Sequence, residues 1–264
     1  MKKIFVGIDS GSTQCKAVVM SEEGLLDTLA VKTGWNPKTS AEESLAVLKE
    51  RNDLDSREIL VAATGYGREA IDFAEYTMTE ITCHAYGGIY LMPDIQGIID
   101  IGGQDSKVIQ IQAGKPVNFL MNDKCAAGTG RFLKMACDTL EIPLDQIDEF
   151  TDPHQAVSIN SMCTVFAESE IIGLLAMQKD RAQIMAGVLQ SIARKIQQQA
   201  GKLEFTADKP ILMTGGLSQS GLLIDTIAQH MGYEVKSCSQ ALYAGAIGAC
   251  LCAAQKSNHS IRGV

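Results

Sequence analysis

Two cysteines lie at positions that core packing alone does not explain. Cys125 lies in NDKCAAGTGRFL (residues 122–133) and Cys163 in SMCTVFAESE (residues 161–170), each just before a segment with helical periodicity. A thiol at the N-terminal end of a helix meets free N–H donors and a partial positive charge, which favour the thiolate and suit an anionic cofactor. The alternative is two unrelated cysteines, because a free cysteine is most often a small buried apolar residue.

Two thiolates are too few for a closed metal site, since an iron–sulfur cube or a structural zinc ion normally takes four ligands. The chain has no C-x-x-C pair to supply more. A two-fold axis would bring two copies of the pair together as four ligands. The hypothesis, set against two unrelated cysteines, is that Cys125 and Cys163 of each subunit hold one [4Fe–4S] cluster on the axis of a homodimer.

Three predicted strands end in turns that contain glycine, namely IDSGST (8–13), IDIGGQDS (99–106) and MTGGLS (213–218). Glycine lets backbone N–H groups come close to phosphate oxygens. One such turn could be an ordinary hairpin, but three at successive strand ends indicate a nucleotide site. Neither a Walker A loop nor a G-x-G-x-x-G motif is present. The predicted nucleotide-binding residues are Ser12, Thr13, Gln14, Cys15, Lys16, Gly102, Gly103, Gln104, Gly215 and Gly216.

Two aspartates lie before the glycines of the first two of these turns. Asp9 and Asp100 each end a predicted strand, and they could hold Mg²⁺ through its water molecules because Mg²⁺ gives up its waters reluctantly. Gln104 or Asp105 could orient an attacking water. We therefore predict that Asp9, Asp100 and Gln104 are the catalytic residues.

The elements around these residues repeat along the chain. Strands are predicted at 3–9, 15–21 and 25–32, and the same succession returns at 97–101, 106–112 and 116–120. Asp100 follows Asp9 by 91 residues (100 minus 9). A duplication of this kind indicates two related subdomains that face each other. Helices are predicted at 40–50, 68–75, 81–92, 130–140, 165–177, 181–203, 218–232 and 240–254, and further strands at 58–63, 210–213 and 233–236.

The composition narrows the class of partner. The chain has 264 residues, 46% of them apolar, with a formal net charge of −8 and no cluster of lysine or arginine. This charge disfavours nucleic acid and anionic membranes as partners. No apolar run reaches the roughly 18 residues of a membrane span, and MKKIFVGIDS is too short in apolar residues for a signal peptide. We expect a cytoplasmic protein, in which the eight cysteines do not form a disulfide framework.

The sequence resembles a superfamily of ATPases. GIDSGSTQCKAVV, DIGGQDSKVIQI and MTGGLS are similar, in this order, to the phosphate 1, phosphate 2 and adenosine motifs of acetate and sugar kinases, heat-shock chaperones and actin. The resemblance implies an α/β protein with two ribonuclease-H-like (actin-like ATPase) subdomains and ATP in the cleft between them. The expected parts are a first subdomain (1–96), a second with nucleotide loops and cluster cysteines (97–239), a helix returning to the first (240–255) and a disordered tail (256–264).

Two longer motifs narrow the resemblance. NDKCAAGTGRFL and SMCTVFAESE, together with DIGGQDSK, are very similar to the activator components of 2-hydroxyacyl-CoA dehydratases, and benzoyl-CoA reductase ATPase subunits are close kin. The family implies a homodimer with one bridging [4Fe–4S] cluster on the residues that match Cys125 and Cys163. It also implies that ATP binding and hydrolysis change the angle between the helices at the cluster. One low-potential electron then passes to the dehydratase, and a ferredoxin or flavodoxin reduces the cluster again.

Other functions are compatible with parts of this pattern. The same ATPase could donate electrons to another reductase, such as benzoyl-CoA reductase. A small-molecule kinase of the sugar-kinase type would need a general-base aspartate and a polar acceptor pocket, and it would not need Cys125 or Cys163. A third alternative is a non-catalytic, nucleotide-gated interaction protein. We expect His84, in ITCHAYGG, to be packed or exposed rather than catalytic.

Overall fold

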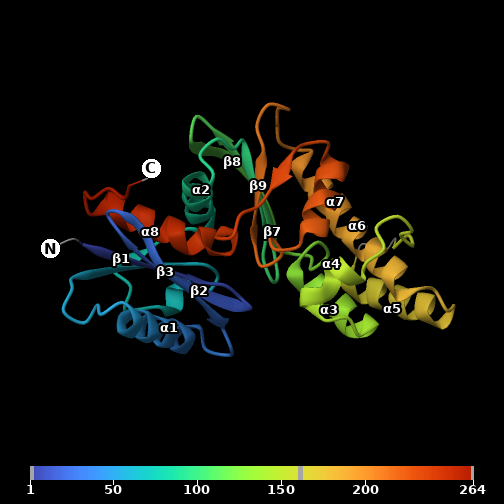
Figure 1. Ribbon diagram of the computed structural model, residues 1–264, viewed down its shortest axis with the longest axis horizontal. Coiled ribbons are helices and arrows are strands. Elements are labelled where there is room, and N and C mark those ends of the chain that lie inside the picture. Colours follow the sequence, from blue (N-terminus) through green and yellow to red (C-terminus); the bar gives the residue numbers. More distant parts are fainter. Residues whose placement is uncertain (1–2, 160–162, 263–264) are drawn as a thin grey trace.

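The computed structural model describes residues 3–159 and 163–262, which form two five-stranded sheets (Figure 1). The first sheet has the order β3-β2-β1-β4-β5 and the second the order β10-β9-β6-β7-β8. In each, three antiparallel strands (β1 to β3, β6 to β8) are extended by one strand parallel to the first of them (β4, β9). This shared topology is what an internal duplication requires. The strands are β1 (Ile4–Ser10), β2 (Gln14–Ser21), β3 (Gly24–Lys32), β4 (Ile59–Thr64), β5 (Tyr76–Thr77), β6 (Gly97–Ile101), β7 (Ser106–Gln112), β8 (Lys115–Asn122), β9 (Ile211–Gly215) and β10 (Val235–Lys236).

The first sheet is covered by helices on both faces, and alternate residues of β1 face each way. Ile4 and Val6 belong to the core cluster shared with α1 (Pro37–Arg51), whereas Phe5 belongs to the cluster shared with α8 (Ala244–Lys256). Every residue of β1 is buried, as expected for a strand with both faces covered. The helix α8 therefore packs on the first sheet although it follows the second sheet in sequence.

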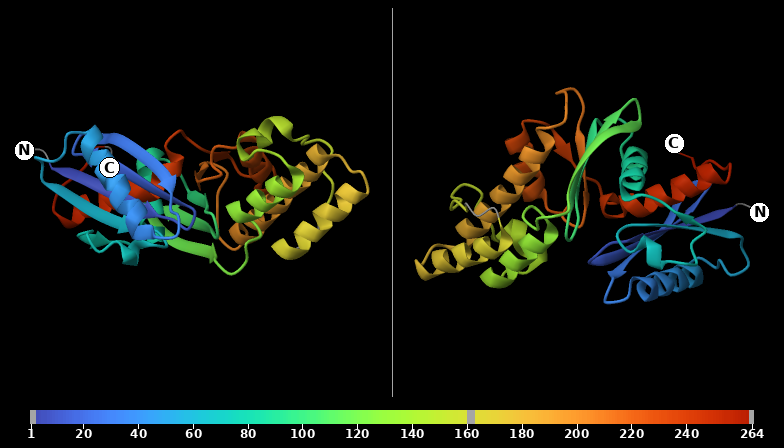
Figure 2. Two further views of the ribbon diagram at one scale, coloured as in Figure 1. Left: turned by 90° about the horizontal axis from the view of Figure 1, so that it is seen from below. Right: turned by 180° about the vertical axis from the view of Figure 1, so that it is seen from behind.

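The helix α2 (Glu80–Leu91) lies between the two sheets (Figures 1 and 2). One side packs against α8, where glycines let the two backbones touch: a Cβ on Gly87 or Gly248 would overlap a carbonyl oxygen of the facing helix. The other side faces the second sheet, where Ala85 shares a core cluster with Ile98 of β6. Because it packs on both halves, α2 carries its first turn into the space between them.

The other face of the second sheet carries the remaining helices, which Figure 2 shows at the end of the molecule away from the first sheet. Their shared core cluster contains Ile99 of β6, Phe132, Ile171 and Ile192. No helix among the described residues is long and apolar enough to cross a membrane. These helices are α3 (Gly130–Leu140), α4 (Ile147–Phe150), α5 (Thr164–Ala176), α6 (Arg181–Ala200) and α7 (Gly221–Met231), and short 3₁₀ helices lie at Arg68–Ala70, Leu144–Gln146 and Ala241–Tyr243.

The prediction of a helix at 68–75 is wrong. Only a 3₁₀ turn, Arg68–Ala70, forms there, and the chain then extends into β5. The reason is pairing with β4, because the N–H of Glu75 donates to Val61 and the N–H of Met78 donates to Ala63. A helix over this segment would leave that edge of the first sheet unpaired.

The tail expected to be disordered is ordered as far as the structure describes it, to residue 262. Ile261 is buried in the cluster that contains Phe5, and the N–H of Arg262 donates to the carbonyl of Glu22 at 2.8 Å. The burial of one large apolar side chain holds this segment on the first sheet. The expected boundaries at 96/97 and 239/240 stay predictions.

Candidate nucleotide and cysteine sites

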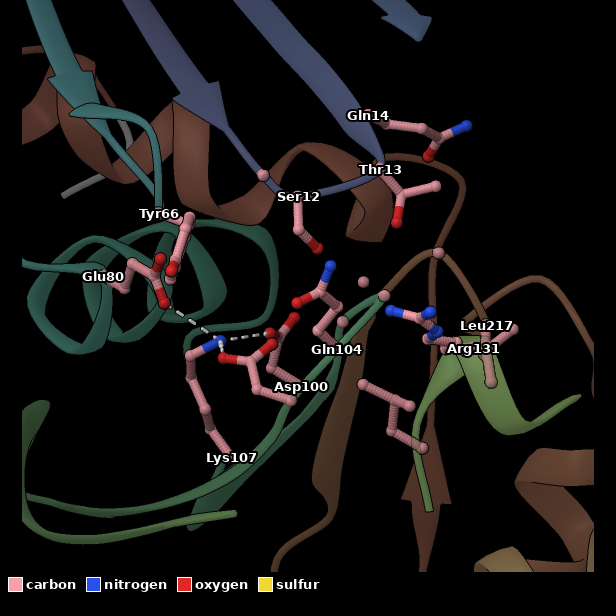
Figure 3. A pocket seen from close by; sticks show the side chains of 18 of the residues that line it. Ser12, Thr13, Gln14, Tyr66, Glu80, Asp100, Gln104, Lys107, Arg131 and Leu217 are labelled. Carbon is pink, nitrogen blue, oxygen red and sulfur yellow. Dashed lines mark hydrogen bonds and ion pairs between the residues drawn. The ribbon is translucent and has the colours of Figure 1, made fainter. Parts of the chain in front are cut away.

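A cavity of about 750 Å³ opens between the two sheets (Figure 3). The three glycine-containing turns, the first turn of α2 and the start of α3 line it. Its volume is in the range of cavities that enclose a small ligand. The predicted site residues that line it are Asp9, Ser12, Thr13, Gln14, Lys16, Asp100, Gly102, Gly103, Gln104, Gly215 and Gly216.

The first turn joins β1 to β2 and directs hydroxyl groups into the cavity. The N–H of Gly11 donates to the carbonyl of Gln14 at 3.1 Å, and the hydroxyl of Thr33 donates to the carbonyl of Gly11 at 2.6 Å. With the turn held in this way, the hydroxyls of Ser12 and Thr13 point toward the cavity, whereas the side chain of Gln14 extends to one side (Figure 3). The turn can therefore offer two hydroxyls to a phosphate group.

An aspartate and a lysine face each other at the base of this turn. Asp9 is the partner of Lys16 in the β1–β2 pair, and the ammonium of Lys16 lies 3.7 Å from the Asp9 carboxylate. The side chain of Lys16 is 13% exposed and lines the cavity. Lys16 thus has one carboxylate neighbour and keeps access to a ligand.

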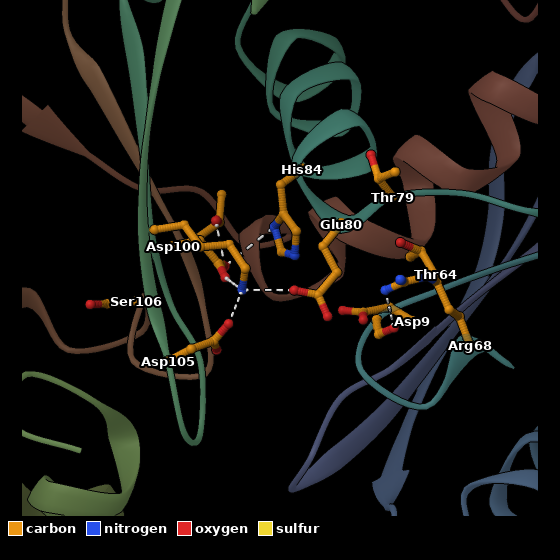
Figure 4. A network of polar contacts seen from close by, with 12 residues as sticks. Asp9, Thr64, Arg68, Thr79, Glu80, His84, Asp100, Asp105 and Ser106 are labelled. Atoms are coloured by element: carbon orange, nitrogen blue, oxygen red, sulfur yellow. Dashed lines mark hydrogen bonds and ion pairs between the residues drawn. The ribbon is translucent and has the colours of Figure 1, made fainter. Parts of the chain in front are cut away.

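Asp100, at the end of β6, is enclosed by polar partners (Figure 4). The hydroxyl of Thr214 donates to its Oδ1 at 2.8 Å, while Nδ1 of His84 and Nζ of Lys107 each lie 3.3 Å from a carboxylate oxygen. Burial alone would raise the pKa of Asp100, but His84, Lys107 and Thr214 outweigh burial and hold this pKa well below its usual range. Asp100 therefore stays ionised and suits a nearby cation.

The third turn follows β9 and requires glycine. Gly215 has a φ of +86°, and a Cβ on it would lie 2.5 Å from the carbonyl oxygen of Ile101. Leu217 and Arg131 lie together beside this turn (Figure 3). One end of the cavity thus combines a close backbone approach with an apolar and a cationic side chain.

Cys15 was predicted to offer its backbone N–H to the nucleotide, and its side chain points away from the cavity. Its side chain is fully buried in the core cluster that contains Ile8 and Leu48, and it does not line the cavity. Successive side chains of a strand point to opposite faces, so a cavity-facing Lys16 places Cys15 on the other face. Burial raises the pKa of the Cys15 thiol to about 11. The Cys15 side chain is therefore not a nucleotide ligand.

Several charged or polar side chains of the cavity were not predicted as site residues, among them Glu80, His84 and Lys107. Glu80 and His84 lie one turn apart on α2, and only tertiary packing brings that helix to the cavity. Lys107 had a signal in the sequence. It follows Lys16 by 91 residues (107 minus 16), the same offset that relates Asp9 and Asp100.

Cys125 and Cys163 lie next to the starts of α3 and α5. Cys163 is the N-cap residue of α5 and is exposed, whereas Cys125 is half-buried in the loop between β8 and α3. The side-chain amide of Asn122 supports this loop by donating to the carbonyls of Cys125 at 2.8 Å and Ala127 at 3.3 Å. Within residues 3–159 and 163–262, no three or more His, Cys, Asp or Glu side chains gather as a metal site. A site with four protein ligands would need some of them from another chain.

The start of α3 is bonded directly to the second phosphate turn. The N–H of Gly130 donates to the carbonyl of Gly102, and the N–H of Arg131 donates to the carbonyl of Gly103, both at 2.9 Å. A helix N-terminus leaves such N–H groups free of partners within the helix. The loop that carries Cys125 therefore ends on a helix whose first turn is attached to the wall of the cavity.

Comparison with known proteins identifies the family. Residues 6–253 match the BadF/BadG/BcrA/BcrD ATPase family. The chain belongs to this ATPase family. It is similar to the (R)-2-hydroxyglutaryl-CoA dehydratase activating ATPase of Acidaminococcus fermentans, with 37% identity over 254 residues that cover 95% of this chain and 97% of the relative.

Solved structures of dehydratase activators have the same fold as this BadF/BadG/BcrA/BcrD chain. Component A of the Acidaminococcus fermentans (R)-2-hydroxyglutaryl-CoA dehydratase matches with a TM-score of 0.90 and 35% identity, covering 97% of this chain and 99% of that chain. The activator of the 2-hydroxyisocaproyl-CoA dehydratase from Clostridium difficile, with bound ADPNP, matches with a TM-score of 0.89 and 32% identity, covering 98% and 96%. These matches confirm the predicted α/β, actin-like ATPase fold and the predicted resemblance to dehydratase activators.

Proposed function

We propose that this protein hydrolyses ATP in the cavity and couples hydrolysis to the transfer of one electron from a [4Fe–4S] cluster, shared by two copies of the chain, to a 2-hydroxyacyl-CoA dehydratase. The observation that carries this proposal is the attachment of α3, which follows Cys125, to the carbonyls of Gly102 and Gly103. That attachment connects a nucleotide-sized cavity with one of the two candidate cluster ligands. Relatives named as dehydratase activators support the choice of partner.

The residues of the cavity suit MgATP. The hydroxyls of Ser12 and Thr13 and the ammonium of Lys16 would bind phosphate oxygens. Five carboxylates, three lysines and one arginine border the cavity, and a divalent cation would offset the formal excess of one negative charge. Asp9 and Asp100 would hold Mg²⁺ through its waters, because both end strands at the cavity and both are buried. Gln104 would orient the attacking water.

The cysteines suit a cluster shared by two subunits. Cys163 is an exposed thiol at the N-terminus of α5, so it is accessible as a ligand. Beside it, Val165 and Phe166 of α5 are 67% and 70% exposed, so the surface around the thiol is apolar and open to a second copy. Cys125 and Cys163 of each copy would ligate the cluster, which when bound would supply the low-potential electron.

Coupling would pass through the start of α3. When the two halves close on a nucleotide, the second turn must shift with the phosphates, and the bonds from Gly130 and Arg131 must move or break with it. Asn122 holds the carbonyl of Cys125 at the other end of the same loop. The backbone around Cys125 would therefore change with nucleotide state, and hydrogen bonds near a cluster set its reduction potential.

The partners follow from this chemistry. A ferredoxin or flavodoxin would reduce the cluster, and the protein would act as a cytoplasmic homodimer. The same site could serve another reductase, such as benzoyl-CoA reductase, because the electron leaves from the cluster and not from the nucleotide site. An ATP-bound state that associates with the dehydratase no better than the ADP-bound state would contradict gating by nucleotide.

The decisive test is metal content and dehydratase activation under anaerobic conditions. The purified wild-type protein should be a brown dimer with about four irons, and with ATP and a reductant it should activate a 2-hydroxyacyl-CoA dehydratase. Cys163→Ala should lose the iron and the activation but still hydrolyse ATP, because Cys163 does not line the cavity. The half-buried Cys238 provides a control, Cys238→Ala, which should keep both. A Cys163→Ala dimer with a full cluster would refute the proposal.

A further inference from the structure

The duplicated turns each contain an aspartate and a lysine in equivalent positions. Asp9 is opposite Lys16 in the β1–β2 pair, and Asp100 is opposite Lys107 in the β6–β7 pair. Both pairs border the cavity. Two lysines at equivalent positions would be expected to have the same role at the site, yet the side chains around them differ.

Lys107 is enclosed by three carboxylates (Figures 3 and 4). Its ammonium lies 2.6 Å from Asp105, 3.1 Å from Glu80 and 3.3 Å from Asp100, and its side chain is 3% exposed. An ammonium has three N–H donors, so these three acceptors match its capacity. Burial alone would lower the pKa of Lys107, but the charges of Asp100, Glu80 and Asp105 outweigh burial and raise it. Lys107 is therefore charged and has no donor left for a nucleotide.

Two of the three carboxylates around Lys107 lie at the two ends of the second phosphate turn. Asp100 precedes the turn and Asp105 ends it, where the carbonyl of Asp105 accepts the N–H of Gly102 at 2.9 Å. The third carboxylate, Glu80, belongs to the first turn of α2, which packs against both halves of the molecule. One ammonium thus fixes the two ends of the turn to each other and to α2.

We propose that Lys107 is a positioning residue for ATP hydrolysis, which holds the turn Gly102–Gln104 in shape and attaches it to α2 without touching the nucleotide. This inference rests on the proposed ATP hydrolysis and assigns its counterpart Lys16 to the phosphates. Displacement of reacting groups by about 1 Å can lower a rate by about 100-fold. Loss of Lys107 should therefore act on the chemical step, and loss of Lys16 on ATP binding.

The test is steady-state ATP hydrolysis, with rates expressed per nucleotide-binding site counted by ADP titration. Lys107→Met should lower kcat by about 100-fold and change the KM for ATP by less than about 3-fold, whereas Lys16→Met should raise KM by about 10-fold or more. Lys209, exposed and paired with Asp94 at 2.8 Å, provides the control: Lys209→Met should match the wild type.

Two milder variants keep the test independent of folding. Glu80→Gln and Asp105→Asn each remove one charge around Lys107 and keep the size of the side chain, and each should lower kcat by about 3- to 10-fold with little change in KM. A purely structural role would lower the number of binding sites but leave the rate per site unchanged, which would overturn the inference. So would a rise in KM for Lys107→Met that matches the rise for Lys16→Met. A wild-type protein that hydrolyses no ATP would instead refute the proposed function.

Discussion

The two phosphate turns have a common plan but different surroundings. In the first, DSGSTQCK, Ser12 and Thr13 present hydroxyls to the cavity and Lys16 has one carboxylate neighbour. In the second, DIGGQDSK, Gly103 and Gln104 stand where the first turn has Ser12 and Thr13, and Lys107 has three carboxylate neighbours. The first turn is equipped to meet a ligand, whereas the second is held by its own side chains.

The difference arises from few positions. Gln14 in the first turn corresponds to Asp105 in the second, since both lie two residues before the lysine. Gln14 is neutral and cannot compensate Lys16, whereas Asp105 pairs with Lys107 at 2.6 Å. Glu80 then reaches Lys107 from α2 at 3.1 Å. The two copies of a duplicated aspartate–lysine pair can thus take different roles. The lysine of the first copy is open to a ligand, and the lysine of the second copy supports the turn itself.

The largest difference between the turns should appear in stability. Lys107→Met should lower the free energy of unfolding by about 3–5 kcal/mol, because it removes the one cation that three mostly buried carboxylates share. Lys16→Met should lower the free energy of unfolding by less than Lys107→Met does, because Lys16 has one carboxylate neighbour, at 3.7 Å, instead of three. Urea unfolding of the nucleotide-free protein measures both. Equal losses of unfolding free energy would mean that the two lysines contribute equally to stability, which would contradict the comparison.

A substitution in the first turn should make it resemble the second. Gln14→Asp places a carboxylate on the same strand face as Lys16 and should pair with it, which would weaken MgATP binding by about 10-fold, or about 1.4 kcal/mol. Gln14→Asn is the matched control because it shortens the side chain equally without adding charge. Isothermal titration with MgATP measures the affinities. Equal affinities for the two variants would show that Lys16 does not act on the phosphates.

The smallest expected effect on stability is that of a substitution at Cys15, whose counterpart in the second turn is Ser106. Cys15→Ser should cost about 1 kcal/mol at pH 7, because it buries a hydroxyl among apolar side chains, and should leave ATP affinity unchanged. Measurement of urea unfolding from pH 7 to pH 10, together with ATP titration, checks both statements. A loss of ATP affinity would show that the Cys15 side chain also contributes to the nucleotide site.

The stability deficit of Cys15→Ser should disappear as the pH rises. The folded pKa of the Cys15 thiol is raised to about 11 from an ordinary value of 9.0. The unfolded wild-type chain therefore releases this proton first, and the folded wild-type protein loses stability as the pH rises above 9. By pH 10 the loss reaches about 1.4 kcal/mol, which the serine variant does not share. A deficit that stays constant to pH 10 would contradict the buried, protonated thiol.

Sequence patterns located the cavity because its main features are local. A buried strand that ends in an aspartate and then glycine identifies a turn wherever the sheet is placed, so Asp9, Asp100 and Gly215 were found without the fold. Strand alternation could also have separated Cys15 from Lys16. The offset of 91 residues could have identified Lys107. The catalytic and cluster-binding roles of these residues remain predictions.

Other features depend on contacts between distant segments. The helix predicted at 68–75 failed because the segment pairs with β4, a partner that local periodicity does not reveal. The tail was expected to be disordered, but Ile261 packs in the core cluster that contains Phe5, a residue far away in the sequence. His84 has the pattern of an ordinary helical residue, and only the position of α2 brings it to Asp100.

The amino-acid sequence by itself determined the duplicated turns, the acidic and glycine residues within them and the cysteines that precede two helices, because each depends on neighbours along the chain. Only the tertiary structure decided which lysine is enclosed and which is open. Glu80 reaches Lys107 because glycines let α2 lie against α8 and so place its first turn over the second sheet. Charge pairing between separate elements depends on their packing, and packing is a property of the whole chain.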